Sequence, residues 1–90
     1  MTKSQIIKTI HKNSELRYVD VEEVVNQLFD IISDSIAEEE KVVISGFGTF
    51  EKIYQTSYSG VNPSTGEKIT VEGFNKVRFT SSRVLRDKIN

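Results

Sequence analysis

Two segments of the chain decide its fold: ISGFGTFE at residues 44–51 and GVNPSTG at residues 60–66. In the first, the glycines on either side of Phe47 allow a sharp bend or a positive φ, so the chain can reverse while Phe47 and Phe50 point into a core. In the second, Asn-Pro-Ser-Thr-Gly is typical of a turn and contains the single proline of the chain. The run from Gln55 to Ser59 is polar, without an apolar face that could pack against a globular body, so we expect an arm that projects with Pro63 at its tip.

Hydroxyl side chains mark the starts of two short helices. Thr2 and Gln5 fit a capping box, which predicts a first helix over roughly residues 3–13. Thr-Ser-Ser at residues 80–82 offers caps for a last helix over about residues 81–90. Each of these helices has an apolar edge, so each needs a surface to pack against.

The second helix is longer and more widely apolar. Apolar residues recur at three- and four-residue spacing from Val21 to Ile36, with Asp20 and Glu23 as the opening pair. Because packing on one neighbour needs a narrower apolar stripe, we expect this helix to contact two surfaces. A β-rich sequence follows from residue 41, and the predicted order of elements is α-α-β-β-β-α.

The 90 residues predict one domain, with a helical base over about 1–40, a sheet and arm over about 41–80, and the last helix over 81–90. A monomeric core of this size would be marginal, which favours association. With no cysteine and one histidine, the chain has no disulfide and no metal cluster, and we expect no cofactor. No apolar run resembles a signal peptide or a membrane span, so we expect a soluble, intracellular protein.

Charge is distributed unevenly along the chain, whose formal net charge is −1. Residues 1–40 hold four basic and nine acidic side chains, a net −5, whereas residues 41–90 hold eight basic and four acidic side chains, a net +4. The basic excess gathers near the end, at Lys76, Arg78, Arg83, Arg86 and Lys88. By itself this ending is best explained as a solvated amphipathic helix.

The G-F-G-x-F motif at residues 46–50 and the G-x-N-P-x-T-G motif at residues 60–66 resemble those of the HU/IHF family of bacterial histone-like, nucleoid-associated proteins. The similarity runs along the whole chain, and residues 44–46 and 78–86 look closer to IHF-type members. The resemblance implies an α+β fold and an intertwined homodimer, or a heterodimer with a related subunit. It also implies a helical base, two protruding β-arms that enter the minor groove and bend double-stranded DNA, and a cytoplasmic, nucleoid-associated location.

The resemblance also assigns roles to individual residues. Pro63 would be the wedge between base steps, and Asn62 would contact the groove beside it. The other DNA contacts are expected from Lys3, Tyr58, Lys68, Lys76, Arg78, Ser82, Arg83 and Arg86. The dimer core is expected to hold Phe29, Phe47, Phe50 and Phe79, because aromatic residues at core spacing are far more often core than a base-stacking platform.

The arm departs from the family in its charge. Ile53, Gln55, Tyr58 and Val61 stand where basic residues are usual in the family, which leaves Lys52, Lys68 and Lys76 on or near the arm. Fewer phosphate contacts lower the affinity and flatten its salt dependence. Because bending a site costs on the order of 1 to 6 kcal/mol, we expect a preference for DNA that is already bent, nicked or formed into a junction.

Other interpretations stay open beside this one. A dimer with the same fold and arginine-poor arms could act mainly as a protein-interaction or dominant-negative partner with weak DNA binding. An enzyme is not expected, because neither paired carboxylates with a metal pattern nor a nucleophile constellation is visible. The run Glu38-Glu39-Glu40 is interpreted as a solvated helix end, with partner binding as the alternative, and His11 as a boundary side chain.

Overall fold

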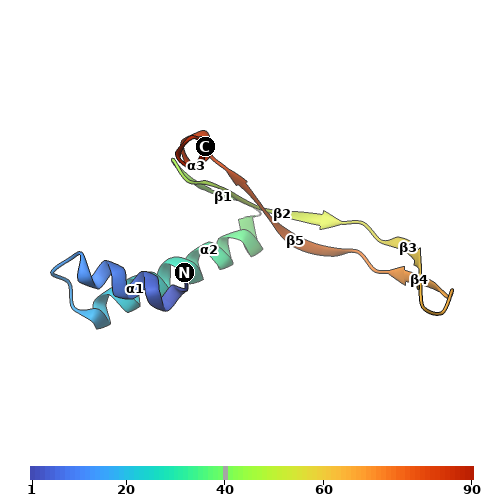
Figure 1. The fold of residues 1–90 in the computed structure, drawn as a ribbon, viewed down its shortest axis with the longest axis horizontal. Helices are drawn as coiled ribbons and strands as arrows, with labels where there is room; N and C mark the ends of the chain where they lie inside the picture. The colour runs from blue at the N-terminus through green and yellow to red at the C-terminus, as the bar shows by residue number, and fades with distance from the viewer. Residues whose placement is uncertain (40) are drawn as a thin grey trace. The chain divides into compact units, whose positions relative to one another are not determined.

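The computed structural model describes residues 1–39 and 41–90 of the chain (Figure 1). Their elements, in order, are α1 (Lys3–Lys12), α2 (Tyr18–Glu39), β1 (Lys41–Ile44), β2 (Gly48–Gln55), β3 (Tyr58–Val61), β4 (Lys68–Val71), β5 (Phe74–Ser81) and α3 (Arg83–Ile89). The chain divides into two compact units, Met1–Asp34 and Ser35–Asn90, which are described one at a time. Glu40, the last residue of the predicted acidic helix end, lies outside the described residues.

The first unit contains α1 and the greater part of α2. The predicted capping box is confirmed, because the Gln5 amide donates to Thr2 Oγ1 at 3.2 Å and the Thr2 amide donates to Gln5 Oε1 at 2.8 Å. Ile7 of α1 is buried together with Val21 and Val25 of α2. These three side chains form the core of the helical pair, since burying apolar area is the main favourable term in folding.

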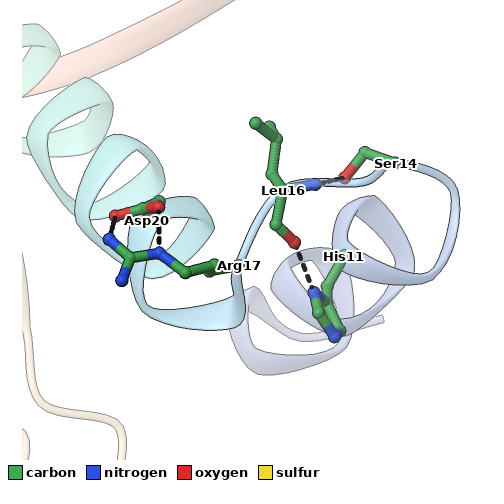
Figure 2. Close-up of polar contacts among 5 residues, drawn as sticks. All are labelled: His11, Ser14, Leu16, Arg17 and Asp20. Atoms are coloured by element: carbon green, nitrogen blue, oxygen red, sulfur yellow. Dashed lines mark hydrogen bonds and ion pairs between the residues drawn. The ribbon is translucent and has the colours of Figure 1, made fainter.

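The turn between the two helices is held by polar contacts (Figure 2). The ring of His11 lies with Nδ1 2.8 Å from the carbonyl oxygen of Leu16, and the Leu16 amide donates to Ser14 Oγ at 3.4 Å. The His11 ring also packs edge-on against Tyr18, with centroids 5.6 Å apart. His11 lies in the last turn of α1, and its side chain is exposed where a boundary position was expected.

The start of α2 differs from the expectation. The helix begins at Tyr18, and Asp20 lies in its first turn instead of preceding it. The Asp20 carboxylate accepts two hydrogen bonds from Arg17, from Nε at 2.9 Å and from Nη2 at 3.2 Å (Figure 2). Glu23 accepts from the side-chain amide of Gln27 at 3.3 Å. The predicted opening pair was therefore wrong, because each carboxylate bonds to a nearby side chain.

The second unit is built on antiparallel strands. β1, β2 and β5 form a three-stranded sheet in the order β1-β2-β5, and β3 pairs with β4 in a separate two-stranded ladder. β2 and β3 are separated by residues 56–57, and β4 and β5 by residues 72–73 (Figure 1). The predicted α+β fold is confirmed, but each of the two arm strands is divided in two, so five strands are observed among the described residues where three were expected.

The reversal between β1 and β2 depends on two glycines. Gly46 has a φ of 76°, which favours glycine, and the Phe47 amide donates to the Ile44 carbonyl at 3.0 Å to close the turn. Gly48 is needed for a different reason: a Cβ built there would lie 2.6 Å from Cε1 of Phe79. The missing side chain thus leaves room for the Phe79 ring beside the strand.

No helix within residues 1–39 and 41–90 is long and apolar enough to cross a membrane.

Candidate nucleic-acid interface

The tip of the arm is a turn organised by Asn62. Its backbone amide donates to the Glu67 carbonyl at 2.8 Å, and its carbonyl accepts from the Gly66 amide at 2.7 Å. Its side-chain Oδ1 accepts from the Ser64 amide at 2.9 Å, and Gly66 takes the φ of 75° that the return of the chain requires. Pro63 is exposed within this turn. A rigid pyrrolidine ring is therefore presented on a turn that is already formed.

The same bonds limit what Asn62 can offer. Its side-chain oxygen is already used by the Ser64 amide, and the residue is half-buried. The group that remains for an external acceptor is the side-chain NH₂, which is a donor. Acceptors on base edges in the minor groove, at adenine N3 and thymine O2, are complementary to that donor.

The two faces of the β3–β4 ladder differ in polarity. Directly opposed residues of antiparallel strands share a face, and the register opposes Tyr58 to Val71 and Gly60 to Ile69. That face is apolar and includes the phenol ring of Tyr58, which is 54% exposed. The other face contains Val61 opposite Lys68, and Ser59 opposite Thr70. Lys68 is the only cation in these two strands.

The β1-β2-β5 sheet has an inner and an outer face. The register aligns Val42, Phe50 and Phe79 in one row across the three strands, and Lys41, Glu51 and Arg78 in the next row. Successive side chains on a strand point to opposite faces, so the two rows lie on opposite sides of the sheet. In the apolar row Val42 and Phe50 are half-buried and Phe79 is exposed, whereas in the charged row only Glu51 is half-buried, so we take the apolar row as the inner face.

The candidate phosphate ligands of β5 lie on the outer face. Lys76 is opposite Ile53, two positions from Arg78 along the same strand, so both cations share that face. The Arg78 guanidinium forms an ion pair with Glu51, its neighbour on β2. Glu51 is the only acidic residue in β1, β2 and β5. One of the two predicted cations is thus already paired with a carboxylate.

The start of α3 follows directly from β5. Ser82 caps the helix, with its Oγ accepting from the Leu85 amide at 3.0 Å, and its own amide donates to the Phe47 carbonyl at 2.9 Å. The predicted hydroxyl cap is therefore confirmed, and the Ser82 hydroxyl hydrogen remains available to an acceptor. Arg83 lies 3.6 Å from the carboxylate of Asp87, with both side chains largely exposed, and Arg86 is exposed on the same helix.

Three of the four predicted core phenylalanines form one cluster. The ring of Phe79 lies 4.8 Å from Phe50 and 5.5 Å from Phe47, measured between centroids. Phe47 and Phe79 are still 45% and 41% exposed in the single chain. Phe29 belongs to the first unit, where it is 41% exposed on α2, and Lys3 is the first residue of α1 in that unit. The three clustered rings present an incompletely covered apolar surface.

Sequence reasoning missed the ion pair of Arg78 with Glu51. The two residues are 27 positions apart, and only the strand register brings them together. A signal was nevertheless present, because Glu51 is the single acidic residue between Lys41 and Glu67. No group of three or more His, Cys, Asp or Glu side chains that could hold a metal ion was found in the described part of the chain.

Comparison with known proteins gives a consistent result. The family model described as bacterial DNA-binding protein matches residues 1–90. The chain is 33% identical over 89 residues to DNA-binding protein HU-1 of Halalkalibacterium halodurans, covering 99% of each chain. It is 36% identical over 91 residues to the integration host factor subunit beta of Alkalilimnicola ehrlichii, covering 100% of this chain and 91% of the relative.

Solved structures show the same fold. An Anabaena HU–DNA cocrystal structure superimposes with a TM-score of 0.89 at 22% identity, covering 99% of this chain and 97% of that chain. A V42I mutant of HU from Thermotoga maritima superimposes with a TM-score of 0.71, also at 22% identity, and each chain is covered completely.

Proposed function

Because this chain belongs to the bacterial DNA-binding protein family, which contains HU and the integration host factor subunits, we propose that it is an architectural protein that binds and bends DNA. The observation that carries the proposal is the tip of the arm, where Pro63 is exposed on a turn that three hydrogen bonds of Asn62 hold in place. Its role is structural, as in its family, and not enzymatic.

DNA bends when the free energy gained from protein contacts offsets the cost of deforming the duplex. HU and IHF are themselves members of the architectural class in which an apolar wedge enters a base step from the minor groove and kinks the duplex. Unstacking a step costs a few kcal/mol, which is offset by the extra protein surface that bent DNA can contact. A proline suits this role because its ring is apolar and its φ is fixed, so little conformational entropy is lost on insertion.

The functional unit is a dimer with an identical or related subunit, as the naming of the relatives as alpha and beta subunits supports. α2 presents Val24, Leu28 and Ile31 at helical spacing, and these side chains are 66%, 50% and 60% exposed in the single chain. Val21 and Val25 of the same helix are buried. An exposed apolar stripe of this kind marks an association surface, so the wide apolar arc of α2 has a second partner.

The arm and the rest of the chain contribute differently to DNA binding. We assign the phosphate contacts to Lys3, Lys68, Lys76, Arg78, Ser82, Arg83 and Arg86, with Tyr58 at the sugar–phosphate edge. Between Gln55 and Asn75 the arm holds Lys68 against Glu67 and Glu72, a net charge of −1. The arm therefore supplies an apolar wedge, and most of the electrostatic attraction to DNA comes from the rest of the chain.

The low positive charge of the arm determines which form of DNA is preferred. Less electrostatic free energy is available to offset bending, so nicked, junction or already bent DNA is preferred over straight duplex. In the cell, this activity places the protein on DNA in the nucleoid, within the cytoplasm, where it would contribute to DNA condensation.

A binding titration at two salt concentrations tests the proposal. We expect measurable binding at low salt to nicked and four-way DNA, weaker binding to straight duplex of equal length, and a decrease in affinity as salt rises. Fluorescence energy transfer between the ends of a nicked duplex reports bending in the same samples. If no DNA form bound at low salt, the proposal would fail, and the alternative of a dimer that acts mainly on protein partners would be favoured.

A further inference from the structure

We propose that Glu51 restrains DNA binding by holding Arg78 in an ion pair on the outer face of the sheet, so that this arginine contributes less to phosphate binding than an unpaired arginine would. This inference rests on the proposed function, since it concerns how strongly the same surface attracts DNA. It identifies Glu51 as a residue that sets the affinity and the salt dependence of binding.

The position of Glu51 carries the proposal. Glu51 lies on β2, the middle strand, where it is opposite Lys41 of β1 on one side and Arg78 of β5 on the other. One carboxylate therefore lies between two cations in a single row. All three side chains share the outer face, because directly opposed residues of antiparallel strands point the same way. Lys76 extends this cationic face along β5. Glu51 is the single acidic group among these three strands.

The geometry of the pair explains its effect on binding. The Arg78 side chain is 57% exposed and the Glu51 side chain is 32% exposed, so the carboxylate is the more covered partner and the guanidinium can still be reached. A phosphate that binds Arg78 must displace the carboxylate or lie beside it at the cost of repulsion between like charges. Either way, Arg78 contributes less to binding than an unpaired arginine would.

Salt dependence gives the proposal a quantitative consequence. Each phosphate contact adds about 0.9 to the slope of log K against log salt. Release of Arg78 in both subunits of a dimer would therefore steepen the slope by roughly 2, which makes the loss of affinity between 50 and 200 mM salt about tenfold larger. Glu51→Gln removes the charge while it keeps the size of the side chain.

A second substitution tests whether Glu51 acts on DNA binding through Arg78. If Glu51 acts by holding Arg78, Glu51→Gln should steepen the slope in the wild-type background and change it little when Arg78→Gln is already present. If Glu51 repelled DNA directly, both backgrounds would respond equally. Glu15→Gln is the matched control, because it removes the same charge from the exposed turn between α1 and α2.

The experiment measures the binding of nicked DNA at five salt concentrations for wild type, Glu51→Gln, Glu15→Gln, Arg78→Gln and the double variant, with circular dichroism to verify folding. The expected result is a steeper slope and tighter low-salt binding for Glu51→Gln alone. Equal slopes for Glu51→Gln and a DNA-binding wild type would overturn the inference while the proposed function stands. An equal effect of Glu51→Gln in the Arg78→Gln background would also overturn it. Failure of wild type and Glu51→Gln to bind DNA would overturn both.

Discussion

The phenol ring of Tyr54 occupies the space directly above Gly73, where a Cβ atom would overlap the ring and its hydroxyl. Tyr54 is opposite Asn75 in the β2–β5 register, so its diagonal neighbour is Gly73, which directly precedes β5. The contact lies at the point where β5 begins at Phe74 and β4 ends at Val71. An aromatic side chain of one strand therefore covers the break in the other, at the base of the arm.

Gly73→Ala should loosen the base of the arm. The added methyl group would meet the Tyr54 ring and lie 2.9 Å from the carbonyl oxygen of Gln55, so the strands must separate locally. Overpacking of this kind typically costs about 1 to 3 kcal/mol. Amide hydrogen exchange should show reduced protection at residues 53–55 and 74–76, with α1 and α2 unchanged.

The matched control for that variant is the double substitution Gly73→Ala with Tyr54→Ala. Removal of the ring relieves the larger clash, so protection should recover toward that of Tyr54→Ala alone. An unchanged exchange pattern in Gly73→Ala itself would show that the ring can move aside without cost.

Gly48→Ala should destabilise the second unit. Its Cβ would lie 2.5 Å from Cζ of Phe79 and 2.6 Å from the carbonyl oxygen of Thr80, and the backbone oxygen cannot move independently of the sheet. We expect a loss of about 1 to 3 kcal/mol in the free energy of unfolding, measured by urea denaturation. Gly46→Ala is the comparison, since it meets no atom within 4 Å and its cost comes from the positive φ alone. Equal stability of Gly48→Ala and wild type would contradict the close packing of Phe79.

Leu28→Lys should disrupt association. Leu28 is 50% exposed in the single chain, and the dimer would bury it, so the lysine would place an uncompensated charge in the interface. Such a charge costs about 3 to 5 kcal/mol. Sedimentation equilibrium should show a shift toward monomer, and the melting temperature should fall at equal concentration.

Gln27→Lys controls for the added charge at the neighbouring position. Gln27 is exposed and four residues after Glu23, an arrangement in which a lysine forms a favourable pair along the helix. This variant should remain associated. Association of Leu28→Lys at the level of Gln27→Lys would mean that the stripe on α2 does not face the partner.

Pro63→Ala should reduce bending more than affinity. Alanine keeps the turn hydrogen bonds of Asn62 but presents a methyl group in place of a rigid ring, so insertion into a base step is weaker. We expect a smaller bend angle by fluorescence energy transfer, with the affinity for nicked DNA changed by less than about tenfold. Equal bend angles for wild type and Pro63→Ala would refute the wedge role.

Local signals in the sequence determined most of the secondary structure. The capping pair of Thr2 and Gln5, the cap at Ser82 and the glycine turn at Gly46 all depend on neighbours within a few positions, so residue type alone indicates them. The turn at Asn62 is equally local. The predicted order of helices and strands, and the projecting arm with its proline tip, followed from these signals and from the apolar periodicity.

The tertiary structure alone decided which distant residues meet. The pairing of Glu51 with Arg78 and the covering of Gly73 by Tyr54 depend on strand register, which the turn geometry and the apolar inner face set together. The division of the arm strands also depended on the register, because the breaks at residues 56–57 and 72–73 both lie between the Gln55–Phe74 pair and the Tyr58–Val71 pair. A list of basic residues counts Arg78 as a free cation, whereas the register shows that an adjacent carboxylate already holds it.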